Sequence, residues 1–138
     1  GFERVGDQVL LDGDFTEVEP STQRFLKKNF PLGGGAFRIL PWFFVRFLIK
    51  KYLKRHNVFV FFIHPYEVSA KKCPKVKGLK LKNKIRFTFG RGSVRKKIEK
   101  TIKLLKRHGF EFSVMNEMVE KALISGEVAS SAQAEQVV

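Results

Sequence analysis

The feature that most constrains the fold is a run of six apolar residues, 58–63, that ends in the sequence His-Pro-Tyr-Glu. Aromatic and β-branched residues fill the run, which is typical of a strand buried on both faces in a parallel sheet. Pro65 has no N–H for a neighbouring strand, so the strand is expected to end before it. This places His64 at the carboxyl end of an interior strand, where α/β proteins hold their functional groups. The alternative is a histidine that only terminates a core strand.

The N-terminal third predicts a hairpin, a connection and a glycine turn. Extended runs at 8–11 and 15–18 flank Asp12-Gly13, a dipeptide that favours the positive φ values of a tight turn. Residues 23–32 have the composition of a connecting segment. Three glycines at 33–35 then permit either a sharp turn or a close approach of the backbone to an anion or a sugar.

Periodicity predicts two helices in the rest of the chain. Pro41 suits a first helical turn, and apolar residues recur at helical spacing from there to about Arg55. A second helix is expected from Val94 to Arg107, with Ser93 as N-cap and Gly109 at the left-handed cap. The remaining expectations are a basic connection over 68–92 that holds at most a short strand or turn at 85–89, a strand at 110–114, helical turns at 117–124 and a disordered tail at 125–138.

Extended segments that alternate with helices predict an α/β protein built on a parallel sheet or barrel. Residues 1–124 are expected to form one domain or part of a larger one. Because the chain starts at Gly1 and enters a turn pattern at once, we expect further sequence upstream of it. The longest apolar run, 39–45, is far shorter than the roughly 20 residues that span a bilayer.

The charge balance indicates an anionic partner or a solvated basic surface. The chain holds 27 basic and 13 acidic residues, for a formal charge of +14. Nucleic acid, an anionic membrane surface and an acidic polymer are therefore candidate partners.

Few residue combinations in the chain support catalysis. It has no His-x-x-x-His pair, nucleophile elbow or phosphate loop, and its single cysteine, Cys73, excludes a cysteine-built zinc site. The remaining cluster is His64 with Tyr66, Glu67, Arg38 and the polar strand exit at 17–22. It amounts to one wall of a site with an imidazole as proton donor, which is too little for a complete hydrolase.

Four motifs give the chain a specific family resemblance. They are Glu-Val-Glu-Pro-Ser-Thr at 17–22, the glycine run with Phe-Arg-Ile-Leu-Pro at 33–41, Ile-His-Pro-Tyr-Glu at 63–67 and Lys-Gly-Leu at 77–79. In this order they resemble the C-terminal portion of the NodB-homology polysaccharide deacetylases, which are carbohydrate esterases. The resemblance runs from about Phe15 to Glu117 and is closest to the branch found in exopolysaccharide gene clusters, often beside the exosortase system.

The resemblance implies the C-terminal part of an irregular (β/α)7-type barrel that removes N-acetyl groups from a polysaccharide or oligosaccharide. It implies a divalent metal, with zinc expected, held by one Asp and two His in earlier motifs, so no metal ligand is assigned in this chain. That metal polarises the acetyl carbonyl and activates a water. The resemblance also implies a second Asp as base, which likewise lies in the earlier motifs. His64 matches the motif histidine, which protonates the departing amine as general acid. Without the earlier motifs, the chain alone is expected to be inactive.

The resemblance also implies a substrate-binding mouth. Ala36 stands where the branch usually has an aromatic residue, and Tyr66 stands where tryptophan is commoner, so the sugar-stacking surface is expected to differ. The residues expected to contact substrate are Arg38, Gly34, Gly35, Tyr66 and Glu67.

Two other functional hypotheses compete with the deacetylase. One is a non-catalytic basic module that binds nucleic acid or an acidic glycan through Lys75–Arg95. It lacks the interleaved aromatic residues of RNA-binding surfaces. The other is a membrane-surface helix over 41–55, ranked last because its basic residues cluster at one end.

Overall fold

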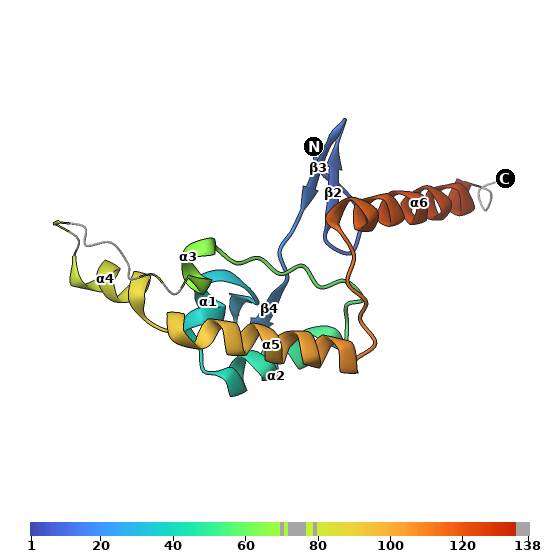
Figure 1. The fold of residues 1–138 in the computed structure, drawn as a ribbon. Helices are drawn as coiled ribbons and strands as arrows, with labels where there is room; N and C mark the ends of the chain where they lie inside the picture. Colours follow the sequence, from blue (N-terminus) through green and yellow to red (C-terminus); the bar gives the residue numbers. More distant parts are fainter. Residues whose placement is uncertain (70, 72–76, 79, 135–138) are drawn as a thin grey trace.

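The N-terminal residues form a three-stranded antiparallel sheet in the computed structural model, which describes residues 1–69, 71, 77–78 and 80–134. Its strands, β1 (Glu3–Gly6), β2 (Val9–Asp12) and β3 (Phe15–Val18), lie in the order of the sequence. The turn between β2 and β3 holds Gly13 at φ 58°, so the predicted Asp-Gly hairpin is confirmed. The C-terminal helix α6 (Met115–Ala134) packs against β1 (Figure 1).

A second hairpin replaces the connecting segment predicted at 23–32. Strands β4 (Thr22–Phe25) and β5 (Lys28–Pro31) pair antiparallel and are joined by Leu26 and Lys27. Both turn residues have positive φ, 46° and 62°, as a two-residue hairpin turn requires. The prediction was wrong because such turns normally carry glycine or asparagine, and neither marks this one.

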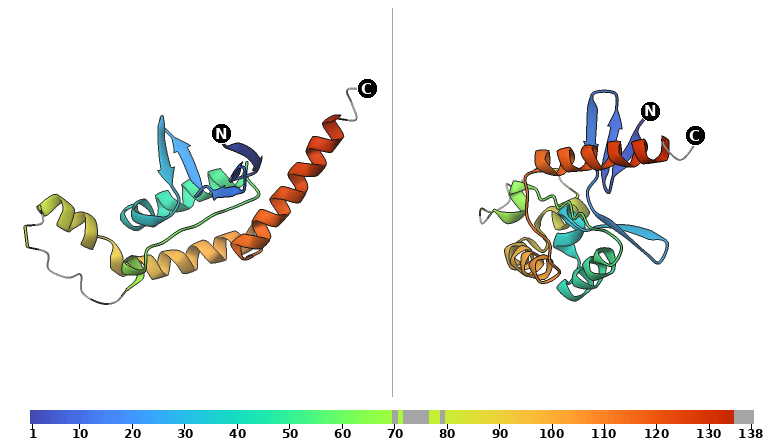
Figure 2. Two further views of the ribbon diagram at one scale, coloured as in Figure 1. Left: turned by 90° about the horizontal axis from the view of Figure 1, so that it is seen from above. Right: turned by 90° about the vertical axis from the view of Figure 1, so that its right-hand side faces the viewer.

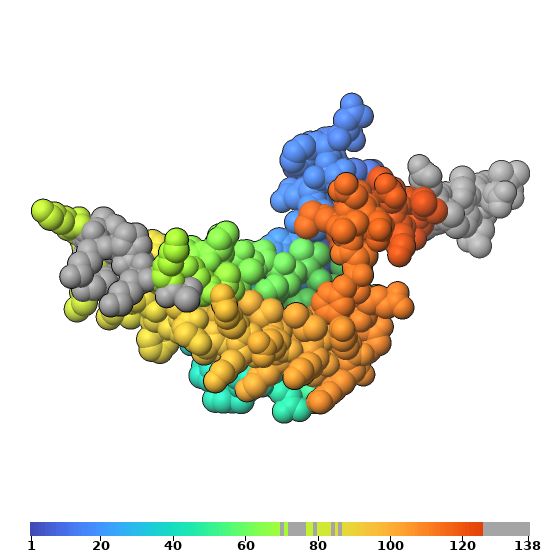
Figure 3. Space-filling model, viewed as in Figure 1, coloured from blue at the N-terminus to red at the C-terminus, as the bar shows by residue number. Residues whose placement is uncertain are grey.

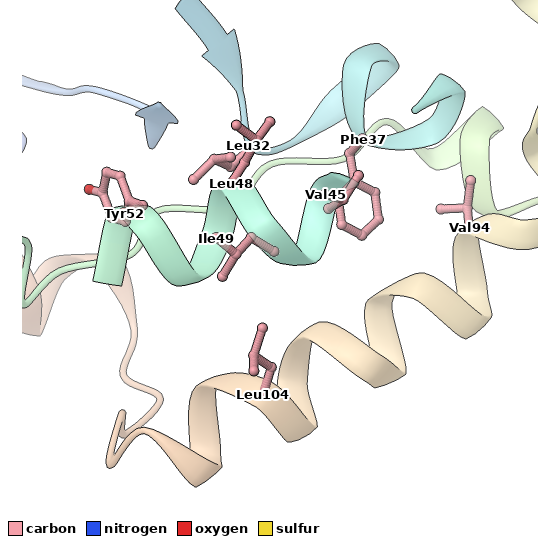
Figure 4. Packing of buried hydrophobic residues seen from close by; sticks show 8 residues of the cluster. All are labelled: Leu32, Phe37, Val45, Leu48, Ile49, Tyr52, Val94 and Leu104. Carbon is pink, nitrogen blue, oxygen red and sulfur yellow. The ribbon is translucent and has the colours of Figure 1, made fainter. Parts of the chain in front are cut away.

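Three helices and the chain between them enclose the hydrophobic core. The helices are α1 (Gly34–Ile39), α2 (Trp42–Leu53) and α5 (Arg91–Arg107). Side chains of α2 point towards α1 and α5, which confirms the predicted apolar stripe of α2 (Figure 4). The core cluster consists of Leu32, Phe37, Val45, Leu48, Ile49, Tyr52, Val94 and Leu104.

The apolar run at 58–63 is extended, but it is not a strand of a sheet. Its side chains alternate, and Phe59, Phe61 and Ile63 pack against the core. In the part of the chain that the structure describes, neither this run nor the predicted strand at 110–114 belongs to one of the two sheets. The predicted parallel sheet is therefore absent from the described residues, whose sheets are small and antiparallel. The coarser prediction, a mixed α/β fold, is confirmed.

One hydrogen bond and one close backbone approach from the glycine run hold the extended segment in place. The Gly34 N–H donates to the Phe62 carbonyl at 3.0 Å, and a Cβ at Gly33 would lie 2.6 Å from the same carbonyl oxygen. Two residues before Phe62, the segment is also bonded to Ser21. The Ser21 N–H donates to the Val60 carbonyl at 3.0 Å, and Ser21 Oγ accepts from the Val60 N–H at 2.8 Å. The close approach that the glycines permit is thus to residues of this chain.

The C-terminal half contains more helix than predicted. Helix α3 (Pro65–Val68) follows the extended run, and α4 (Leu81–Thr88) occupies the region predicted as a loop with at most a strand or turn at 85–89. Leu81, Ile85 and Phe89 are spaced four residues apart, a helical period that the alternating lysines concealed. Part of the predicted connection, residues 70, 72–76 and 79, lies outside the described residues.

The two C-terminal helix boundaries also differ from prediction. Helix α5 begins at Arg91 after Gly90, so Ser93 is not its N-cap; its Oγ donates instead to the Gly90 carbonyl at 2.9 Å. The predicted end at Arg107 and the left-handed Gly109, at φ 79°, are confirmed. Helix α6 continues to Ala134 through most of the predicted tail, and residues 135–138 lie outside the described part.

Substituting Gly90 by alanine is expected to destabilise the fold. Gly90 has φ 80°, and a Cβ there would lie 2.5 Å from the carbonyl oxygen of Arg38, a backbone atom. The left-handed conformation alone costs a residue with a Cβ about 1–2 kcal/mol, and the collision adds to it. The measurement is urea unfolding followed by circular dichroism. Gly92→Ala in the same helix is the matched control, since its Cβ would meet nothing within 4 Å; equal stability of both variants would contradict the expectation.

Candidate functional site

His64 lies at the surface where the extended run meets α3. Its backbone is extended, at φ −86° and ψ 141°, and its ring is exposed. The ring stacks on Tyr66, with centroids 5.7 Å apart, and meets Phe62 edge-on at 5.9 Å. The imidazole is therefore held between two aromatic rings and open to a ligand.

A buried carboxylate fixes the backbone beneath His64. Glu67 is fully buried, and its Oε2 accepts the His64 N–H at 3.1 Å, while its own N–H donates to the His64 carbonyl at 2.9 Å. Its Oε1 lies 3.5 Å from Nη1 of Arg38, which is 2% exposed. This reciprocal pair of bonds closes the His-Pro-Tyr-Glu turn and fixes the backbone from which the imidazole projects.

Arg38, which lies on α1, contacts both this turn and α4. Its guanidinium lies 5.5 Å from the centroid of the Tyr66 ring, within the range of a cation–π contact. Its Nη1 also donates to the Phe87 carbonyl of α4 at 3.4 Å. Because Arg38 sits on α1, the structure brings Arg38, Tyr66, Glu67 and His64 together, as the sequence predicted for one wall of a site.

The predicted substrate contacts occupy different environments. Tyr66 is 39% exposed beside His64, and Gly35 has open space around its Cα. Gly34 gives its N–H to Phe62, and Arg38 and Glu67 are buried against one another. Tyr66 and Gly35 are therefore accessible to a sugar, whereas the other three lie behind them. Direct contact with a substrate stays a prediction for all five residues.

Two arginines of the Lys75–Arg95 stretch, which the sequence offered as a basic binding module, instead support α3. Arg91 donates to the carbonyls of Tyr66, Ser69 and Lys71 at 2.8–3.0 Å. Arg95, one helical turn later, donates to the Val68 carbonyl at 3.2 Å. The available signal was the choice of arginine among many lysines, since a guanidinium binds several carbonyls at once. These contacts leave less of the Lys75–Arg95 stretch free for an anionic polymer.

Lys97 holds α1 onto α5 from the other side. Its ammonium is buried and donates to the carbonyls of Phe37, Arg38 and Leu40 at 2.7–3.2 Å, at the C-terminal end of α1. Burial lowers the pKa of Lys97, while three carbonyls at a helix end favour its charged form. These bonds fix the C-terminal end of α1, the helix that carries Arg38, against α5.

The other two histidines lie elsewhere. His108 is the C-cap of α5. His56 follows the end of α2; its Nδ1 lies 3.0 Å from Asp7, and its ring stacks on Tyr52 at 4.2 Å. Both features hold the N-terminal sheet to α2. Burial raises the pKa of Tyr52, whose hydroxyl donates to the Val58 carbonyl at 3.0 Å.

The described residues supply no metal site. No group of three or more His, Cys, Asp or Glu side chains among them is arranged to hold a metal ion. The expected divalent metal is therefore not assigned to any residue of this chain. In the same part of the chain, no helix is both long and apolar enough to cross a bilayer.

An apolar cleft lies apart from His64. It encloses about 420 Å³ between the extended run and the segment that leads into α6, over α5, and none of the predicted site residues lines it. Its walls include Val58, Val60, Ile98, Phe112 and Met118. Figure 3 shows the extended run as a strip along α5 at the surface of the molecule.

Comparison with known families gives one match. A family model described as a domain of unknown function, DUF3473, matches residues 6–120, which include both hairpins, the glycine run, the His-Pro-Tyr-Glu turn and α5. Comparisons with curated proteins and with solved structures returned no match.

Proposed function

Because this chain belongs to the DUF3473 domain family over residues 6–120, we propose that it is the C-terminal part of a metal-dependent polysaccharide deacetylase. That family is associated with polysaccharide deacetylase-like proteins. The observation that carries the proposal is the exposed imidazole of His64, whose backbone N–H is held by the carboxylate of the buried Glu67. The carboxylate fixes the backbone from which the imidazole projects into solvent.

In the proposed reaction, an N-acetyl group of a glycan is hydrolysed. A base in the preceding part of the domain would accept a proton from water as its oxygen adds to the acetyl carbonyl. The C–N bond then breaks as the departing nitrogen takes a proton from the His64 imidazolium. The products are acetate and a glycan with a free amine. A positioned proton donor of this kind contributes about 10²–10⁴ to the rate. Tyr66 and Phe62 flank the ring and restrict the directions from which a sugar reaches it.

The proposal includes the barrel expected from the resemblance. Two extended segments, 58–63 and 110–114, are joined through α5, as successive strands of a β/α barrel would be. The apolar cleft of about 420 Å³ runs beside both of them. We take these segments as barrel strands whose neighbours are supplied by a preceding part of the same domain, which would also supply the metal ligands.

The test is an assay of acetate release from N-acetylglucosamine oligomers by the full-length protein. We expect release that EDTA abolishes and that added zinc or another divalent cation restores. The 138-residue chain, assayed alone under the same conditions, is the matched control and is expected to be inactive. Release that is insensitive to EDTA would contradict the metal-dependent reaction, and no release from the metal-loaded full-length protein would contradict the deacetylase itself.

A further inference from the structure

Three large apolar side chains protrude together beside α2. Leu26 at the tip of the β4–β5 hairpin is 79% exposed, and Phe43 and Phe47 on α2 are 74% and 46% exposed. The hairpin stands next to α2 (Figure 2), and the ring of Phe25 packs edge-on against Phe47 at 5.4 Å. Hairpin tip and helix therefore present one surface, which we call the hairpin–α2 face. An apolar group of this size at the surface indicates a binding partner.

Basic side chains surround this apolar centre on both elements. Exposed positions on α2 recur at helical spacing and form one stripe, in which the two phenylalanines alternate with cations. The hairpin adds further cations at and beside its tip. The exposed basic residues of the face are Arg24, Lys27, Lys28, Arg46, Lys50 and Lys54.

The face has no acidic side chain of its own. Between Glu19 and Glu99 the sequence contains a single acidic residue, Glu67, and that carboxylate is buried against Arg38. The acidic residues instead gather at the N-terminus, where residues 1–19 hold six of them and one arginine. The cations of the hairpin and of α2 are thus not neutralised from within either element, and the partner that matches them is anionic.

We propose that the hairpin–α2 face binds the surface of a bilayer that contains anionic lipids. Leu26, Phe43 and Phe47 enter the boundary between headgroups and acyl chains, and the surrounding cations contact lipid phosphates. A soluble anionic polymer would match the cations but would leave three large apolar side chains in water. The left-handed backbone of Leu26 and Lys27 supports the same partner, since it holds a leucine outwards at a tip where a polar turn residue is usual.

This inference depends on the hairpin, which the sequence did not reveal. In the sequence of α2 alone, the basic residues gather towards one end, which makes a membrane-surface helix the weakest of the functional hypotheses. With β4 and β5 alongside, Arg24, Lys27 and Lys28 supply cations next to the apolar positions. The proposal doesn't rely on the deacetylase reaction and uses none of the residues placed near His64.

The test is co-sedimentation of the chain with vesicles. We expect binding to phosphatidylglycerol/phosphatidylcholine vesicles, weak binding to pure phosphatidylcholine, and loss of binding as salt is added. Phe43→Ser with Phe47→Ser is expected to weaken binding by about tenfold or more, since two apolar contacts are removed. Phe15→Ser, an equally exposed phenylalanine on the N-terminal sheet, is the matched control and should bind as the parent chain does.

A second pair of variants separates a local face from overall charge. Lys27→Glu with Lys50→Glu is expected to weaken vesicle binding by more than about tenfold, at roughly fivefold for each basic side chain removed. Lys103→Glu with Lys106→Glu, on exposed positions of α5, changes the net charge equally and should have little effect. Circular dichroism of each variant establishes that it is folded. Equal loss in both pairs, equal binding to neutral vesicles, or undiminished binding of the Phe43/Phe47 variant would overturn the proposal in favour of a polymer or a second copy of the chain.

Discussion

Replacing His64 by alanine in the full-length protein is expected to lower the turnover of an N-acetylated oligosaccharide by about 10²–10⁴. His64 is exposed, and its ring stacks on Tyr66 and meets Phe62 edge-on, so its loss removes little buried packing. The fold should therefore persist, and kcat should fall more than KM rises, because the proton is transferred only in the transition state. The measurement is steady-state acetate release, with circular dichroism to establish folding.

Two companion variants make this result specific. His108→Ala removes an exposed histidine at the C-cap of α5 and should leave kcat unchanged. His64→Gln retains a polar side chain of similar size that cannot donate a proton from a cation, so it should be nearly as slow as the alanine variant. An unchanged kcat in His64→Ala would remove His64 from the reaction, and equal losses in the His64 and His108 variants would indicate a general effect on the fold.

The parts of the fold that could be predicted are those fixed by local chemistry. Helix α2 follows from Pro41 and a stripe of apolar residues, and the end of α5 follows from Gly109. The β2–β3 hairpin follows from Asp12-Gly13. In each case the residues that decide the backbone conformation are neighbours in sequence, so no knowledge of distant contacts was needed.

The parts that could not be predicted depend on contacts between distant residues. The turn at Leu26 and Lys27 has unfavourable φ values that the packing of Phe25 on α2 compensates. The run at 58–63 has the composition of a sheet strand, but a strand needs a partner. Within the described residues, only isolated hydrogen bonds from Ser21, Gly34 and the Tyr52 hydroxyl reach it. Propensity describes one segment at a time and cannot supply its neighbour.

The sequence indicated which residues lie near His64, but not which of them are buried and which are exposed. The change from an apolar run to His-Pro-Tyr-Glu located His64, Tyr66 and Glu67 together. That Glu67 and Arg38 lie beneath the surface, with Tyr66 and His64 above them, depends on how α1 meets α3 and α5. Substrate contact stays a prediction for these residues, and the structure adds that Arg38 and Glu67 are buried.

Replacing Glu67 by alanine is expected to cost about 3–5 kcal/mol of unfolding free energy, because it leaves the Arg38 charge buried without its carboxylate. It also removes the acceptor of the His64 N–H. Both losses fall on the turn that carries the candidate proton donor. Urea unfolding measures the first effect, and acetate release by the full-length protein measures the second.

A double variant separates the effect of losing the ion pair from the effect of losing the hydrogen bond that positions His64. Arg38→Met with Glu67→Leu replaces the buried charges by apolar groups of similar size, and its loss of stability should be much smaller than that of Glu67→Ala. Its kcat should nevertheless stay low, since the His64 N–H still lacks an acceptor. Glu67→Gln keeps an oxygen that can accept this bond and should retain more activity than the double variant. If the double variant were as active as the parent, the buried carboxylate would serve only stability, and His64 would hold its position through Tyr66 and Phe62 alone.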